Sequence, residues 1–348
     1  MGKRKAVFMS CLLAIAFGIT AILVALAEKG EKSEGILCVT SFYPVQLLAE
    51  SVSEGAEGVT VRNLTENHSG CIHDYTLTTR DMRLLSEAEL FFINGGEMEL
   101  FLEKAAKEYK KMEIVDTSEG YAFLEGVGHN HDHGAGEPEG EELHDHGLHD
   151  ETDVASCTDP THHHEVNAHI WMDIDGYLMQ LSKVEEAFIK ADPAQEALYR
   201  KNARACRAEL TKLKEAFREA KEELSGIETV VFHEGFVYLL NMLGMETVHC
   251  ISMDSDTQIA AGEAAEVIEE CKFHGITKVF AEADFEETVE DIFGKELSCE
   301  VVVLDPITGA GSTQAGTEET STGGKGVALY CERMRANLEG IRQTYGMR

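Results

Sequence analysis

The chain has 348 residues and a formal net charge of -33 at neutral pH. Its hydrophobic content of 43% is ordinary for a globular protein with a buried core, and its length suggests two domains. A surface this acidic repels nucleic acid and attracts cations, which excludes nucleic-acid binding and favours binding of positively charged ligands.

The first 27 residues predict export. A basic KRK at residues 3–5 precedes an apolar run from Ala6 to Ala27 that ends in small residues. This is the pattern of a secretory signal peptide with a cleavage site. The run is also long enough to remain uncleaved as an N-terminal membrane anchor. We therefore expect a periplasmic or extracellular protein, either free or held at the cytoplasmic membrane.

Residues 36–128 predict a first α/β lobe, because short apolar runs alternate there with helical stretches. Such alternation is typical of a parallel sheet flanked by helices. The expected strands are Ile36–Thr40, Val59–Leu64, Leu90–Ile93 and Glu113–Asp116. The expected helices are Pro44–Val52, Thr78–Glu87 and Glu97–Tyr109.

A histidine-rich segment at residues 129–164 follows this lobe. It mixes nine of the 15 histidines with Asp, Glu and Gly. Imidazole and carboxylate groups bind zinc, copper and nickel, and the segment has too few apolar residues to form a core. We predict a disordered loop that collects metal ions at low affinity; the alternative is an acidic loop whose histidines have no role. The histidines are His129, His131, His133, His144, His146, His149, His162, His163 and His164.

Residues 165–225 are expected to complete the first lobe and to form a long linking helix. Asp192-Pro193 is a helix start, and apolar residues then recur every three or four positions as far as Leu224. At 1.5 Å per residue the helix Pro193–Leu224 spans roughly 48 Å, enough to pack along two lobes. A coiled-coil dimer is less well supported, because the repeat lasts only about four heptads.

The alternation resumes over residues 227–348 and predicts a second α/β lobe. Its expected strands are Thr229–Phe232, Glu246–His249, Lys278–Ala281 and Glu300–Leu304. Its expected helices are Phe236–Leu243, Thr257–Phe273, Phe285–Leu297 and Val327–Tyr345. The fold class is therefore α/β, with two lobes that each contain a mostly parallel sheet flanked by helices and are joined by one long helix.

Eight cysteines lie beyond the predicted signal segment, and none of them forms a CxxC pair. They are spread over a chain that is large enough to fold without disulfides. One or two disulfides can form in an oxidising compartment, and we expect most of the cysteines to pack as small apolar residues.

Four candidate metal ligands lie outside the histidine-rich loop and follow predicted strands or the loop itself. They are His73, His169, His233 and Asp305. Ligands of open parallel sheets bind outside the carboxyl ends of the strands, and each half of the chain contributes two of the four residues. A cleft between the lobes would therefore bring three imidazoles and one carboxylate together as a tetrahedral zinc site. Glu282 also ends a strand, and we expect it to orient a ligand imidazole or to cap the local structure.

Five segments resemble the metal-binding solute-binding proteins of ABC importers, in the zinc/manganese cluster. They are Gly70–Leu102, Asn167–Asp173, Val230–Met245, Lys278–Phe285 and Val303–Gly309. The resemblance runs from about Ile36 to the C-terminus, and the acidic histidine-rich loop is similar to that of the zinc branch. It implies two lobes joined by one rigid helix, a metal ion in the cleft, and delivery to a membrane permease driven by a cytoplasmic ATPase.

The same resemblance assigns the ligands residue by residue. His73, His169 and His233 match the family's three imidazole ligands, and Asp305 matches its carboxylate position. Some zinc members instead use water or a Glu directly before the first His; Ile72 stands there in this chain, so Asp305 or water remains. Manganese members place a carboxylate at the position of His233, and an imidazole-rich site favours zinc.

We predict an exported, monomeric protein without enzymatic activity that captures Zn²⁺ with high affinity and delivers it to an ABC importer. The alternatives are a manganese-specific version of the same component, a surface protein that sequesters zinc or mediates adhesion, and a zinc hydrolase. His233-Glu234 begins like the HExxH motif of zinc proteases, but Val237 stands where the second His is required.

Overall fold

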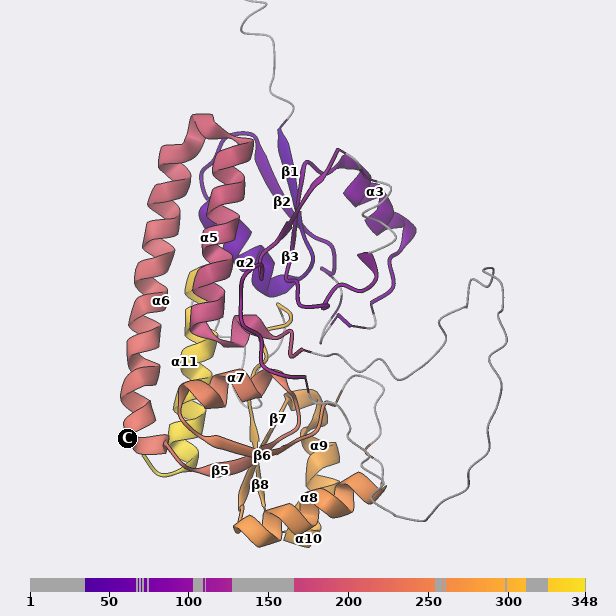
Figure 1. Ribbon diagram of the computed structural model, residues 1–348, viewed down its shortest axis with the longest axis vertical. Helices are drawn as coiled ribbons and strands as arrows, with labels where there is room; N and C mark the ends of the chain where they lie inside the picture. Colours follow the sequence, from indigo (N-terminus) through magenta and orange to yellow (C-terminus); the bar gives the residue numbers. More distant parts are fainter. Residues whose placement is uncertain are drawn as a thin grey trace, which may run out of the picture.

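The computed structural model describes residues 35–66, 68, 70, 72–73, 75–102, 109, 111–126, 166–253, 259, 261–297, 299–310 and 325–347. The predicted signal segment and the predicted metal-collecting loop lie outside these residues. The described part forms two α/β lobes stacked along the long axis of the molecule (Figure 1). Within this part of the chain, none of the helices is both long and apolar enough to cross a membrane.

Each lobe is built on a four-stranded parallel sheet, as predicted. The first sheet has the order β2-β1-β3-β4 and the second has the order β6-β5-β7-β8, so the two lobes share one topology. The strands are β1 (Ile36–Thr40), β2 (Val59–Asn63), β3 (Leu90–Ile93), β4 (Glu113–Asp116), β5 (Glu228–Val231), β6 (Glu246–Cys250), β7 (Lys278–Ala281) and β8 (Glu300–Val303). The predicted strands are confirmed to within one residue at each end.

The helices agree less closely with the prediction. The main ones are α2 (Tyr43–Val52), α3 (Thr79–Glu87), α5 (Ile174–Ala191), α7 (Gly235–Met242), α8 (Ala261–His274) and α11 (Val327–Thr344). The sequence did not separate α5 from the helical region around it. The predicted helix Phe285–Leu297 is divided into a 3-10 turn, α9 (Glu286–Val289), a π-helical stretch (Glu290–Gly294) and α10 (Lys295–Leu297).

The helix predicted from Glu97 begins later than expected. Residues 97–101 form a turn, and Glu97 adopts a φ of 65° directly after two glycines that also have positive φ. A right-handed helix cannot contain such a residue. Most of the remainder of this predicted helix lies outside the described residues.

The long helix is present as α6 (Glu196–Leu224), with a 3-10 turn at Pro193–Gln195 before it. Figure 1 shows α6 along one side of both lobes, beside α5 and α11. Its buried residues are those of the predicted apolar face: Tyr199, Ala203, Cys206, Leu210, Leu213, Phe217, Ala220 and Leu224. The helix therefore supports both lobes through a continuous hydrophobic stripe.

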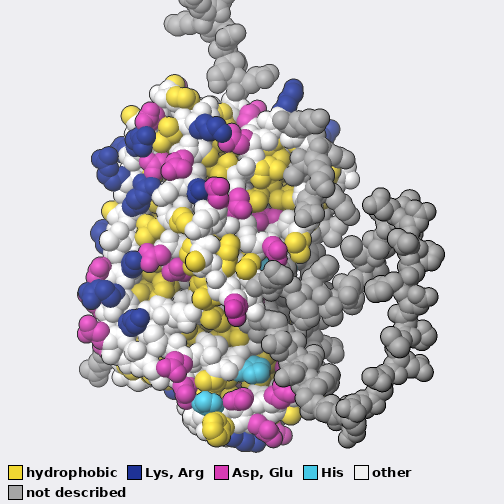
Figure 2. Space-filling model, viewed as in Figure 1, with side chains coloured by type: hydrophobic (Ala, Val, Ile, Leu, Met, Phe, Trp, Pro, Cys, Tyr) yellow, Lys and Arg dark blue, Asp and Glu magenta, His cyan; other side chains and the backbone are white. Residues whose placement is uncertain are grey.

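Charged side chains of α6 contribute less to its attachment than the buried apolar stripe does. Figure 2 shows Lys and Arg side chains gathered along the edge of the molecule where this helix lies. Several form ion pairs with α5, including Arg207 with Glu185 and Lys214 Nζ with Asp175 Oδ1 at 2.6 Å. Glu185 is buried, whereas Lys214 and Asp175 are both exposed, and an exposed ion pair contributes about 0–1 kcal/mol to stability. The apolar stripe, which runs along the whole helix, therefore dominates its attachment.

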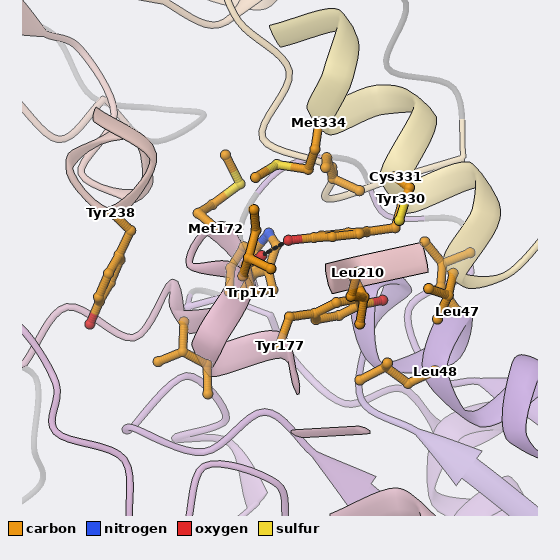
Figure 3. Packing of buried hydrophobic residues seen from close by; sticks show 14 of the residues in the cluster. Leu47, Leu48, Trp171, Met172, Tyr177, Leu210, Tyr238, Tyr330, Cys331 and Met334 are labelled. Atoms are coloured by element: carbon orange, nitrogen blue, oxygen red, sulfur yellow. Dashed lines mark hydrogen bonds between the residues drawn. The ribbon is translucent and has the colours of Figure 1, made fainter. Parts of the chain in front are cut away.

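Buried aromatic side chains join the two lobes close to the predicted ligands (Figure 3). Trp171 Nε1 donates to the carbonyl oxygen of Pro306 at 2.8 Å, and the Tyr330 hydroxyl donates to the carbonyl oxygen of Trp171 at 2.6 Å. The rings of Tyr330 and Tyr177 stack with their centroids 3.9 Å apart. These contacts fix the segment that contains His169 against α11 and against the chain that follows β8.

Candidate metal centre

Three of the predicted ligands lie side by side where the lobes meet. His73 follows β2, His169 directly precedes the 3-10 turn Ile170–Met172, and His233 follows β5. The ring centroids of His73 and His169 are 5.5 Å apart, and those of His169 and His233 are 4.7 Å apart. His169 and His233 are buried, and His73 is partly exposed. The tertiary structure therefore brings three imidazoles from two lobes into one cluster.

Two carboxylates stand beside this cluster. Among the described residues, His73, His169 and Glu234 form a group whose potential ligand atoms all lie within 4.8 Å of one another. The carboxylate of Glu282 places Oε1 3.2 Å from Nε2 of His233. From the sequence, Glu282 is expected to orient a ligand imidazole or to cap the local structure, and Glu234 is not assigned to the site. The signal for Glu234 was present, since it follows His233 at the same strand end.

His169 is oriented by contacts at one ring nitrogen. Its Nδ1 lies 3.0 Å from Oδ1 of Asn167 and 3.2 Å from Oε1 of Glu234. Asn167 in turn donates from Nδ2 to the carbonyl oxygen of Glu234 at 2.8 Å. Acceptors at Nδ1 favour the tautomer in which Nε2 has the lone pair that a metal requires. Because Glu234 belongs to the second lobe, the orientation of this first-lobe imidazole depends on both lobes.

Asp305 has a different environment from the one predicted. Arg333 of α11 binds both of its carboxylate oxygens, with Nη2 2.6 Å from Oδ1, and the backbone N–H of Ile307 donates to Oδ1 at 2.8 Å. Asn337 bonds both the N–H and the carbonyl oxygen of Asp305, each at 2.8 Å. The bidentate guanidinium pair uses a lone pair on each carboxylate oxygen. These bonds anchor the loop that contains Asp305 on α11.

The electrostatics of the cluster suit a cation. Burial lowers the pKa of His233 well below 6.5, and the neighbouring His169 and His73 lower it further. Burial on its own would raise the pKa of Glu234, but the hydrogen bond with His169 and the charges of the nearby imidazoles bring it down to about 2. At neutral pH the site therefore presents a neutral His233 and an ionised Glu234. Metal binding requires these protonation states.

Comparison with known proteins assigns the family. The family model described as ZnuA, zinc-uptake complex component A, periplasmic, matches residues 38–344. The chain belongs to this family. Its proteins are solute-binding components of transporters that act outside the cytoplasm with an ABC permease and an ATPase.

Similar curated proteins carry zinc-related names. The zinc-binding protein AdcA of Streptococcus pyogenes serotype M3 is 24% identical over 348 residues, which cover 98% of this chain and 62% of AdcA. The high-affinity zinc uptake system protein ZnuA of Bacillus subtilis is 23% identical, over 96% of this chain and 94% of that protein. The chain thus spans about three-fifths of the length of its AdcA relatives.

Solved structures confirm the two-lobed fold of this ZnuA-family chain. The Zn(II)-bound ZnuA-like domain of Streptococcus pneumoniae AdcA matches with a TM-score of 0.65 at 20% identity, covering 89% of this chain and 98% of the other. The solute-binding protein FpvC of Pseudomonas aeruginosa with Ni²⁺ matches with a TM-score of 0.66 at 16% identity, covering 89% and 96%. The shared fold thus extends to proteins with different metals.

Gly235, the first residue of α7, lies against two of the imidazoles. A Cβ at this position would be 2.7 Å from Cε1 of His233 and 3.1 Å from Cδ2 of His169. We expect Gly235→Ala to displace both rings and to weaken zinc binding by about 10-fold or more, which is about 1.4 kcal/mol. Competition with a chromophoric chelator measures the change. Gly340→Ala in α11 is the matched control, because a Cβ there meets nothing within 4 Å and should leave zinc affinity unchanged.

The lowered pKa of His233 predicts a pH dependence of the metal-free protein. The unfolded chain takes up a proton on this histidine below about pH 6.5, whereas the folded chain does not. The free energy of unfolding should therefore decrease as pH falls from about 6.5 toward the pKa of the folded state. Urea titrations between about pH 7.5 and about pH 5.5 should give a shallower slope for His233→Asn than for the parent chain. Equal slopes would contradict the neutral, buried imidazole.

Proposed function

We propose that this chain captures Zn²⁺ between its two lobes, as a monomer outside the cytoplasm, and delivers it to an ABC importer composed of a membrane permease and a cytoplasmic ATPase. The observation that carries the proposal is the cluster of three imidazoles and two carboxylates where the lobes meet. The zinc-related names of the AdcA and ZnuA relatives support the same function.

The ligand set that we propose is His73, His169, His233 and Glu282. Two ligands of a tetrahedral zinc ion, each bound at about 2.0–2.1 Å, lie about 3.3 Å from each other. The separation of 3.2 Å between Nε2 of His233 and Oε1 of Glu282 is close to that value. Glu234 contacts Nδ1 of His169, which is the usual position of a residue that orients an imidazole ligand.

The donor set favours zinc over manganese. Three imidazoles and one carboxylate suit Zn²⁺, whereas Mn²⁺ prefers sites dominated by oxygen ligands. Four protein ligands would also leave no open coordination position, which a zinc hydrolase needs for its metal-bound water. Capture and delivery therefore fit these residues better than catalysis does.

Titration of the metal-stripped chain with Zn²⁺ and then Mn²⁺ tests the ligand set. We expect one tight zinc site that is lost in His73→Ala, His169→Ala and His233→Ala. Glu282→Gln should weaken zinc binding by about 100-fold or more, since even the loss of a residue that orients a ligand costs 10–100-fold.

Asp305→Asn is the matched control for the carboxylate assignment, with its fold checked by unfolding of the metal-free protein. It should lower stability, because it disrupts the pair with Arg333, and should leave zinc affinity nearly unchanged. Weak zinc binding in Asp305→Asn with normal binding in Glu282→Gln would reverse the assignment. Tight manganese binding with weak zinc binding would overturn the choice of metal.

The histidine-rich segment at residues 129–164 is proposed as a low-affinity collector of zinc. Deleting it should retain the tight site, remove weaker zinc sites from the titration, and slow zinc-dependent growth of a complemented strain only when zinc is scarce. Loss of the tight site on deletion would show that the loop supplies a ligand. Normal uptake at limiting zinc would show that it does not collect the ion.

A further inference from the structure

Two cysteine residues of the second lobe lie close together in one hydrophobic cluster. Cys271 belongs to α8, and Cys299 directly precedes β8. Each thiol shifts the pKa of the other, as expected for two sulfur atoms in close proximity. The residues are far apart in sequence, so their proximity is produced by the tertiary fold of the second lobe.

The backbone around the pair holds both sulfur atoms in place. The N–H of Ile276 donates to the carbonyl oxygen of Cys271 at 2.8 Å, and Sγ of Cys299 donates to the carbonyl oxygen of Ile276 at 3.2 Å. Immediately after Cys299, the N–H of Glu300 donates to the carbonyl oxygen of Thr277 at 2.8 Å. The turn after α8 is therefore bonded to both cysteines, and Ile276 holds the two residues next to each other.

The two thiols differ in access to solvent. Cys271 is buried in the core of the second lobe, whereas Cys299 is only partly buried at its edge. Both are free thiols in the structure. A soluble oxidant would therefore meet Cys299 first, with Cys271 behind it as the second thiol.

We propose that Cys271 and Cys299 form a disulfide that closes the second lobe after export. The thiolate of Cys299 attacks one sulfur of a small-molecule disulfide such as oxidised glutathione, which forms a mixed disulfide and releases one thiolate. The thiolate of Cys271 then attacks the sulfur of Cys299 and releases the second thiolate. The two cysteine protons pass to the two released thiolates, so two cysteine thiols are oxidised and one external disulfide is reduced.

The bond would enclose β7 and Glu282, the proposed fourth zinc ligand. Closing a loop of this length restricts the unfolded chain, and we expect the melting temperature to rise by about 5–10 °C. Burial raises the pKa of Cys271 to about 12, and burial also raises the pKa of Cys299, although the neighbouring Cys271 lowers the latter in part. Formation should therefore be slow at neutral pH and faster in alkaline buffer.

The test uses the full chain incubated with oxidised glutathione at about pH 8, followed by denaturation, alkylation of free thiols and peptide mass spectrometry. We expect a reductant-sensitive peptide that links Cys271 to Cys299. The control Cys331→Ala should give the same linked peptide. Three outcomes would overturn the proposal. They are free alkylated Cys271 and Cys299, a mixed disulfide that persists on Cys299, and a link from either residue to another cysteine.

Thermal unfolding provides a second measurement that does not depend on identifying the linked peptides by mass spectrometry. The oxidised parent chain should lose several degrees of melting temperature on addition of reductant. Cys271→Ala/Cys299→Ala should melt at the same temperature with and without reductant, and a reductant effect in this variant would contradict the assignment. The proposed disulfide requires export of the protein but does not involve the zinc ligands. Zinc titration of the same double variant therefore tests the proposed function separately from the disulfide.

Discussion

The molecule depends on one apolar core that continues from the first lobe into the second. The buried stripe of α6 contributes to it along the whole helix, and Trp171, Tyr177 and Tyr330 extend it across the boundary between the lobes. Burial of apolar surface is the largest favourable contribution to folding. Because the two sheets share this core, the carboxyl ends of their strands are held at a defined distance. The ligands at those ends can therefore form a single site, although they come from separate sheets.

Burial also determines the chemistry of this site. Imidazoles that are packed together away from water are disfavoured in their charged forms, as the lowered pKa of His233 shows. The carboxylates of Glu234 and Glu282 remain within ion-pair distance of His169 and His233. A neutral His233 beside an ionised Glu234 leaves a local excess of negative charge and lone pairs. A divalent cation supplies the missing positive charge, which gives a physical reason for metal affinity at this position.

One asparagine and one arginine side chain fix the groups around the imidazole cluster. Asn167 bonds to both His169 and the backbone of Glu234, and so connects the two lobes at the site itself. Arg333 binds the carboxylate of Asp305 and keeps that segment on α11. The sequence points to Asp305 as a candidate ligand but does not show that Arg333 pairs with it.

Local pattern alone predicted most of the secondary structure and pointed to His73, His169 and His233 as candidate ligands. Strands such as Leu90–Ile93 and the apolar face of α6 follow from hydrophobic periodicity, which depends only on nearby residues. Only the tertiary structure shows the surroundings of Asp305, Glu234 and Glu282. The same holds for the proximity of Cys271 to Cys299 and for the turn at Glu97. Each of these depends on partners that are distant in sequence or on a backbone conformation imposed by packing. Periodicity has no information about such contacts, because it records which face of an element is buried but not what lies opposite that face.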